Sequence, residues 1–152
     1  MARGWSAEGT RIMRRKPPDG RLESPIVKDI LDRCSTRLDC DLHRVQVGKY
    51  KPLYGDSDRV ISVGIPGQAD ISGRFRLRGP NFGRRIEIEV KSQTGRRSQD
   101  QINWAERSVS GGDAYLLARS ADHVETMLAK LGAGYVPTGD ADADGNSVLV
   151  LL

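Results

Sequence analysis

Residues 84–92, RRIEIEVKS, carry the most distinctive charged side chains of the chain. Three apolar residues alternate here with three charged ones: Ile86, Ile88 and Val90 with Glu87, Glu89 and Lys91. This period of two predicts a strand that buries its apolar face and exposes two carboxylates and an ammonium on the other. Because like charges two residues apart repel, we expect cations to complete the charged face.

Asp70 is placed to bring a further carboxylate to this face. It follows Gly67 in the segment GQADISG, which we expect to pair with the strand. Carboxylates hold hard divalent cations through oxygen, and such a cation polarises a phosphate and lowers the pKa of bound water. With Lys91 to orient the water or the phosphate, this set suits metal-assisted phosphodiester hydrolysis. For Glu89 and Lys91 taken alone, a solvated strand face is the simpler alternative.

Length and composition indicate one domain with tails. The chain has 152 residues, 29% of them charged, and a net charge of +4. We expect no membrane span, because no apolar run is long enough, and a cytoplasmic location in a bacterial or phage-infected cell, because the N-terminus lacks the apolar middle of a secretory signal. Arginines cluster at 11–15, 74–85 and 96–97. Such clusters favour a polyanion partner, with a basic protein that has no such partner as the alternative.

Two other patterns partly match metal-site motifs but lack the spacing or the ligand that such a site requires. Cys34 and Cys40 are expected to be reduced thiols, and their spacing to His43 matches no zinc motif. Residues 140–145, DADADG, begin like a calcium loop, but Leu151 stands where the twelfth position requires a bidentate acid. We expect an acidic turn there.

The first half of the chain predicts a helix and several strands. We expect residues 1–22 to be a flexible basic arm, followed by a helix with Ser24 as N-cap and Pro25 in the first position. Strands are expected at 42–48, at 59–63, and from Ile71 onward, with a loop over 49–57. The region 74–85 is expected to hold the end of one strand, an exposed basic loop and the start of the charged strand.

The second half predicts a helix, a buried strand and another helix. Ser98 and Gln101 form a capping box that opens a helix ending at Gly111. The uncharged segment 114–118 should then be a parallel crossover strand. Ser120 is expected to cap a helix with Gly132 beyond its end, and the extension 133–152 should contain a short strand at 148–152.

This order of features resembles the PD-(D/E)XK nuclease superfamily, and in detail the small stand-alone members of its VRR-NUC (virus-type replication-repair nuclease) family. The resemblance covers residues 23–120. Four motifs carry it: Glu23-Ser-Pro-Ile26-x3-Ile30-Leu31, Arg44-Val-Gln46-Val-Gly48, Gly67-Gln-Ala-Asp70-Ile-x-Gly73, and Ile88-Glu89-Val90-Lys91 followed by Gly95-Arg96 and Ser98-x-x-Gln101. Three positions depart from the family pattern: Ala69 replaces a frequent Pro, Gln46 a common Asn, and Glu87 a usually apolar residue.

The resemblance implies an α/β fold with a restriction-endonuclease-like core, a central mixed sheet flanked by helices, in a nuclease domain spanning residues 23–132. It implies that Mg2+ or Mn2+ is held by four residues: Glu23, Asp70, Glu89 and the backbone carbonyl of Val90. Lys91 would position the attacking water, stabilise charge, or serve as base if its pKa is lowered, and Gln101 would orient Lys91 or the scissile phosphate. The catalytic residues would thus be Asp70, Glu89, Lys91 and Gln101.

The expected partner is DNA. The basic loop, with Arg74, Arg76 and Arg84, is the best candidate for backbone contacts, and Arg44 and Arg96 are weaker ones. The resemblance further implies an endonuclease that cuts branched DNA as a homodimer, in the manner of Holliday-junction resolvases. Two alternatives remain open: a nuclease of the same fold acting on flaps, ends or duplex sites, and a non-catalytic nucleic-acid-binding module.

Overall fold

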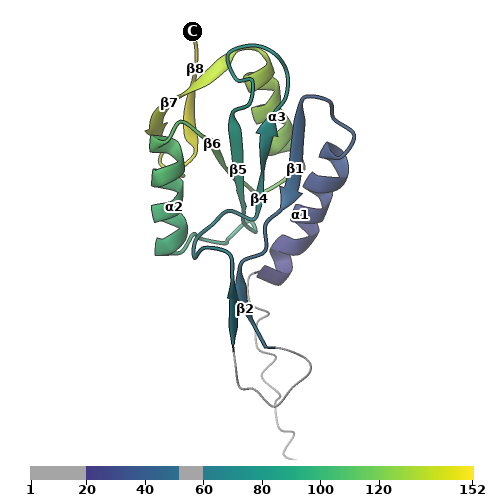
Figure 1. Cartoon of the computed structure of the whole chain (residues 1–152), viewed down its shortest axis with the longest axis vertical. Coiled ribbons are helices and arrows are strands. Elements are labelled where there is room, and N and C mark those ends of the chain that lie inside the picture. Colours follow the sequence, from purple (N-terminus) through teal and green to yellow (C-terminus); the bar gives the residue numbers. More distant parts are fainter. Residues whose placement is uncertain (1–19, 52–59) are drawn as a thin grey trace, which may run out of the picture.

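A four-stranded mixed sheet lies at the centre of the computed structural model, which describes residues 20–51 and 60–152 (Figure 1). Its order is β1–β4–β5–β6, with these bounds: β1 (Cys40–Arg44), β4 (Ile71–Phe75), β5 (Arg85–Val90) and β6 (Ala114–Ala118). β4 runs antiparallel to both β1 and β5, whereas β5 and β6 are parallel. The predicted crossover is confirmed, since α2 (Gln99–Ser110) connects the two parallel strands.

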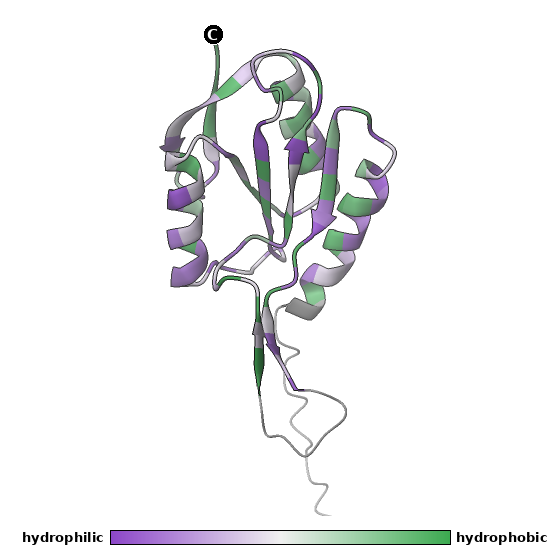
Figure 2. Ribbon diagram, viewed as in Figure 1, coloured by the Kyte–Doolittle hydropathy of each residue, from purple (hydrophilic) through white to green (hydrophobic). Residues whose placement is uncertain are grey.

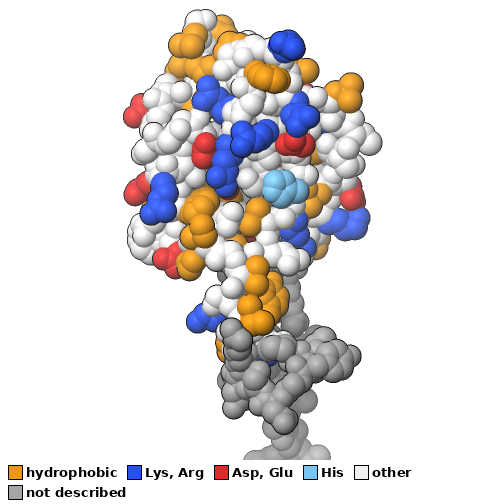
Figure 3. Space-filling model, viewed as in Figure 1, with side chains coloured by type: hydrophobic (Ala, Val, Ile, Leu, Met, Phe, Trp, Pro, Cys, Tyr) orange, Lys and Arg blue, Asp and Glu red, His pale blue; other side chains and the backbone are white. Residues whose placement is uncertain are grey.

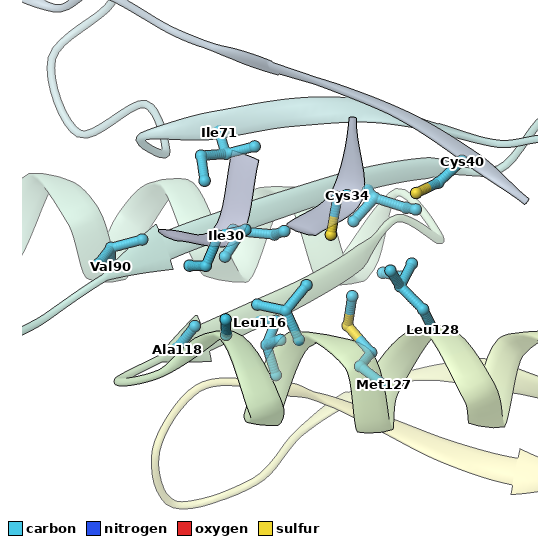
Figure 4. Close-up of a cluster of buried hydrophobic side chains, with 14 of the residues drawn as sticks. Ile30, Cys34, Cys40, Ile71, Val90, Leu116, Ala118, Met127 and Leu128 are labelled. Atoms are coloured by element: carbon cyan, nitrogen blue, oxygen red, sulfur yellow. The ribbon is translucent and has the colours of Figure 1, made fainter. Parts of the chain in front are cut away.

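One face of the sheet is covered by α1 (Gly20–Cys34) and α3 (Ala121–Gly132), and α2 lies on the other (Figure 1). The apolar side of β5 packs into the main core with residues from both helices, among them Ile30 and Leu128 (Figure 4). The ribbons of Figure 2 show the apolar residues of these helices turned toward the sheet. Burial of each such aliphatic side chain contributes about 1.5–3 kcal/mol, which makes this layer the main source of stability.

The boundary of α1 differs from the prediction. The helix begins at Gly20, so Ser24 is not its N-cap and Pro25 lies within it. Residues 21–23 are good helix formers and extend the helix by a turn before Pro25, at the cost of the one hydrogen bond that the proline nitrogen cannot donate. Residues 1–19 of the predicted arm lie outside the described residues.

The predicted strand 42–48 is divided in two. β1 leaves the sheet after Arg44, and Gly48 opens β2 (Gly48–Tyr50), which pairs with β3 (Ile61–Val63) in a separate ribbon. The expected loop over 49–57 therefore begins with strand residues, and its part from 52 to 57 falls outside the described residues. The ladder between β1 and β4 ends at the pair Arg44 and Ile71, and one further hydrogen bond of 2.8 Å, from the N–H of Val45 to the carbonyl of Asp70, closes it before the chain turns into β2.

The two cysteines lie in the main core. Cys34 ends α1 and Cys40 begins β1, both are buried, and both are free thiols (Figure 4). The expected reduced state agrees with this arrangement. Within the described ranges, no helix has the length and apolar character needed to cross a membrane.

The C-terminal residues form the hairpin β7 (Tyr135–Ala141) and β8 (Ser147–Leu151). β7 was not predicted, because it contains Pro137 and Gly139, two residue types that are uncommon in strands. The hairpin protects the edge of the sheet, because Ser147 Oγ and Asn146 Oδ1 accept hydrogen bonds from the backbone N–H groups of β6. In the acidic turn, Asp142 Oδ1 accepts the N–H groups of two following residues, Asp144 and Asn146, each at 2.9 Å.

Replacing Gly73 with alanine should unfold the edge of the sheet. A Cβ at this position would overlap the backbone carbonyl of Asp41 on β1, and backbone atoms cannot swing aside. We expect Gly73→Ala to lower the free energy of unfolding by roughly 2–4 kcal/mol, measured by urea denaturation.

Gly132→Ala is the matched control. A Cβ there would meet only the Phe75 ring, at an ordinary contact distance of 3.8 Å, and Gly132 itself lies in a helix. We expect it to leave stability unchanged or raise it by up to about 1 kcal/mol. Equal stability of the two variants would refute the close packing of β1 on β4.

Candidate active site

The predicted catalytic and metal-binding residues lie at the end of the sheet at which β5 and β6 finish, and four segments of the chain supply them (Figure 1). The site residues are these: Glu23 in the first turn of α1, Asp70 before β4, Glu89 near the end of β5, Lys91 just after it, and Gln101 in the first turn of α2. The antiparallel pairing of β4 with β5 sets the start of one strand beside the end of the other. This topology brings Asp70 to Glu89.

Lys91 is at the centre of the site. Its Nζ lies 2.8 Å from Glu89 Oε1 and 3.5 Å from Glu23 Oε1. The ammonium therefore links the first turn of α1 to the end of β5, two segments more than sixty residues apart in the sequence. Because the side chain of Lys91 is only 8% exposed, water screens these interactions little.

Gln101 contacts Glu89 through its side-chain amide. Its Nε2 donates a hydrogen bond of 2.6 Å to Glu89 Oε1, and its Oε1 accepts the N–H of Ser98 at 2.8 Å. The predicted capping box is confirmed, and it holds the Gln101 amide with its N–H2 group turned toward the carboxylate. The resemblance implied that Gln101 orients Lys91 or a phosphate, whereas in this geometry its partner is Glu89.

Asp70 is fixed beside the end of β5. Its Oδ2 accepts a hydrogen bond of 2.8 Å from the backbone N–H of Val90. The turn before it approaches α2 so closely that a Cβ at Gly67, where φ is +81°, would overlap the backbone of Asp100. Only glycine satisfies both the close approach and the positive φ. Val90 thus takes part through its N–H, and its predicted role as a carbonyl ligand stays a prediction.

The expectation that the charged face of β5 is exposed is wrong. Glu87 and Glu89 are 0% exposed and Lys91 is 6% exposed. A second, smaller apolar cluster covers this face, formed by Ala69, Ala105, Val109 and Tyr115 with Trp104 against it. The amphipathic pattern could not reveal this cover, because α2 lies over the charged side only in the folded chain.

Burial changes the proton affinities of the site. Burial first, and then the charge of Asp70, raise the pKa of Glu89 to about 8. Burial also raises the pKa of Asp70, against the opposing hydrogen bond from Val90. Although burial opposes it, the hydrogen bond and charge of Glu89, with the charges of Glu23 and Asp70, raise the pKa of Lys91. Lys91 therefore keeps its proton, and the three acids compete for one cation.

Such an arrangement is costly for folding. Burying an ion pair usually contributes less stability than packing apolar residues of similar size. Charged groups with shifted pKa values that converge at one end of a sheet are typical of functional sites.

Glu87 belongs to a second polar cluster further back along β5. Its Oε1 forms an ion pair with Arg85 and accepts a hydrogen bond of 3.1 Å from Ser72 Oγ, and its Oε2 lies 3.4 Å from Trp104 Nε1. Arg85, Ser72 and Trp104 were not among the residues predicted for the site. Of these partners, only Ser72 could have been identified from a sequence pattern. Its alternation with Ile71, on the strand paired with β5, places its side chain on the polar face of that strand.

The residues fit a divalent cation by donor type. Three of the four predicted ligands offer hard carboxylate oxygens, and Glu89 Oε2 and Ser92 Oγ are buried without a hydrogen-bond partner among the described residues. Residues 20–51 and 60–152 contain no ready-made group of three or more His, Cys, Asp or Glu side chains disposed to hold a metal ion. In this geometry the ammonium of Lys91 takes the place between Glu23 and Glu89, so coordination requires these side chains to move.

The predicted DNA-binding arginines differ in their surroundings. Arg44 lines a hollow of about 280 Å3 together with Asp70, and Arg96 is exposed in the loop after Lys91. Arg76 pairs with Asp41 at 2.7 Å. Arg84 donates to Asn81 Oδ1 at 2.7 Å and to the carbonyl of Gly112 at 2.6 Å, so it ties the basic loop to the end of α2.

Comparison with known proteins yields no match to any family model or to any curated protein. The resemblance to VRR-NUC nucleases therefore rests on the motifs quoted above.

Glu89 should make the stability of the metal-free protein fall as pH rises. Its pKa is raised from 4.5 to about 8 on folding, so the native state holds a proton that the unfolded state releases, and this contribution is lost between pH 5 and 8. We expect the free energy of unfolding, measured by urea denaturation in EDTA, to drop by roughly 1–3 kcal/mol over this window.

Glu89→Gln should reduce this drop, while Glu125→Gln, which alters an exposed carboxylate on α3, should retain it. Lys91 stays protonated throughout the window and does not contribute. An identical pH dependence in wild type and Glu89→Gln would contradict the burial of Glu89 as an acid.

Proposed function

We propose that this protein is a metal-dependent DNA endonuclease with a PD-(D/E)XK core of the VRR-NUC type. The observation that carries the proposal is the buried ammonium of Lys91, shared by Glu89 and Glu23 beside Asp70 and Gln101. A solvated strand face, the simpler alternative, would leave these groups in water, whereas they are covered by α2.

Each residue has a chemical role in this proposal. Asp70 and Glu89, with Glu23, would hold Mg2+ or Mn2+, which supplies Lewis-acid polarisation of the phosphate and a bound water of lowered pKa. Gln101 holds one oxygen of Glu89 and so fixes the orientation of that carboxylate. Lys91 keeps its proton and can stabilise the negative charge that develops as water attacks phosphorus and the 3′ oxygen leaves.

The choice of substrate rests on charge and on the resemblance. The hollow beside Asp70 is lined by Arg44, and Arg96 lies in the exposed loop that follows Lys91, so cationic groups flank the acidic centre. A phosphate backbone suits such surroundings. The preference for branched DNA and the action as a homodimer come from the resemblance alone and are proposed on that basis.

Cleavage of labelled DNA tests the proposal. With Mn2+ or Mg2+, we expect wild type to cut at least one of three substrates, a four-way junction, a flap or a linear duplex. Lys91→Ala should lower the rate by about 100-fold or more, because it removes the charge beside the reacting group. Lys28→Ala, on the exposed side of α1, should cut like wild type.

Cleavage that persists in Lys91→Ala would indicate a contaminating nuclease. DNA binding without cleavage in either metal would favour the non-catalytic module. Circular dichroism of each variant separates loss of activity from loss of fold.

The positions of the cuts test the branched-DNA hypothesis. Paired, symmetric nicks near the crossover of a mobile junction are expected from a dimer with two active sites on opposed strands. Sedimentation of the protein on the junction should then give two chains per DNA. Cuts confined to linear duplex would remove the junction hypothesis and leave the nuclease assignment in place.

A further inference from the structure

A polar hollow lies on the charged face of the sheet, away from the catalytic cluster. It has a volume of about 310 Å3, and six residues of β1, β4 and β5 line it: Asp41, His43, Ser72, Gly73, Arg74 and Arg85. On this face α2 packs over β6 and β7, so the part formed by β1 and β4 has no helical cover among the described residues. Figure 3 shows Lys and Arg side chains gathered beside a histidine over these strands.

Two arginines face each other across this hollow. Arg74 and Arg85 are directly opposite in the register of β4 and β5. Like charges in this position destabilise a sheet, so the pair is poorly explained by folding alone. Each is nonetheless held in place, Arg74 by the carbonyl of Gly83 at 3.1 Å and Arg85 by its ion pair with Glu87. Two anchored guanidinium groups side by side are suited to bind the oxygens of one phosphate.

The nearby acids do not cancel this charge. Asp41 is already engaged, since its Oδ2 pairs with Arg76 at 2.7 Å and its Oδ1 accepts the backbone N–H of Arg74 at 2.8 Å. Glu87 lies buried beneath the hollow with Ser72 and Trp104 as further partners. Asp113 also interacts electrostatically with Arg85, Arg84 and Arg74. Four arginines at 74, 76, 84 and 85 therefore stand against three carboxylates, at 41, 87 and 113, which leaves an excess of positive charge, and the exposed ring of His43 adds a donor at the rim.

We propose that this hollow is a second phosphate site, in which Arg74, Arg85 and His43 bind the nucleic-acid backbone at a distance from the scissile bond. Arg85 and Glu89 point to the same side of β5, four residues apart, which corresponds to about 13 Å along the strand. One DNA molecule can therefore contact the hollow and the catalytic cluster together. The identity of the ligand rests on the proposed function. The hollow would extend the DNA-binding surface from the catalytic cluster across the sheet.

Binding of a fluorescein-labelled duplex DNA to the intact chain in EDTA tests the site without cleavage. We expect Arg74→Ala to weaken binding by about 5- to 10-fold and to reduce the slope of log affinity against log salt by about 1. Arg33→Ala is the matched control, because Arg33 lies on α1 at the opposite face and pairs with Asp122 at 2.6 Å. It should bind within about 2-fold of wild type.

His43→Glu provides a second variant that removes no side-chain hydrogen bond or ion pair seen among the described residues. It adds a carboxylate to the rim of the hollow and should also weaken binding several-fold, whereas His123→Glu, on the exposed surface of α3, should not. These are the only two histidines of the chain, so the pair differs in place alone.

Wild-type affinity in both Arg74→Ala and His43→Glu would overturn the second phosphate site. If wild type still cuts DNA in that case, the nuclease assignment stands without it. A wild-type protein that neither binds nor cuts DNA would refute both.

Discussion

The buried ammonium of Lys91 is the interaction on which the arrangement of this protein depends. A charge removed from water needs partners within a few ångströms, and here two carboxylates provide them from different elements, Glu89 at 2.8 Å and Glu23 at 3.5 Å. The first turn of α1 must therefore reach the end of β5. Three apolar side chains would serve stability better at this place, so folding stability alone does not account for these charges.

The surrounding elements make this burial possible. Antiparallel pairing brings the start of β4 to the end of β5, and the parallel crossover returns α2 over the charged side of the same strand. The absence of a side chain at Gly67 lets the Asp70 turn approach the first turn of α2, where the capping box directs Gln101 at Glu89. Local geometry at two turns thus controls the electrostatics of the whole cluster.

The charged side of β5 has different surroundings at the two ends of the strand. Toward its end, acids outnumber the single cation, and burial raises the pKa values of Glu89 and Asp70. Toward its start, arginines outnumber acids and open to solvent, which suits a phosphate backbone. In the proposed nuclease, one end of this strand would anchor a polyanion and the other would be the reactive centre, provided that one ligand reaches both.

Much of this protein could be predicted from its sequence, because the signals are local. The capping box at Ser98 and Gln101, the buried strand 114–118 and the apolar face of α3 depend on residues within a few positions of one another, and each was confirmed. The predicted start of α1 and the prediction of one continuous strand over 42–48 were wrong. Where the helix begins and where the strand ends depend on residues and pairing partners beyond the local pattern. Only the tertiary structure decided that the charged face of β5 is buried, that Gln101 contacts Glu89, and that Arg74 lies opposite Arg85. The alternation of apolar and polar residues along a strand shows which side chains share a face. Whether that face is buried, and which other residues lie near it, depends on segments that meet only when the chain has folded.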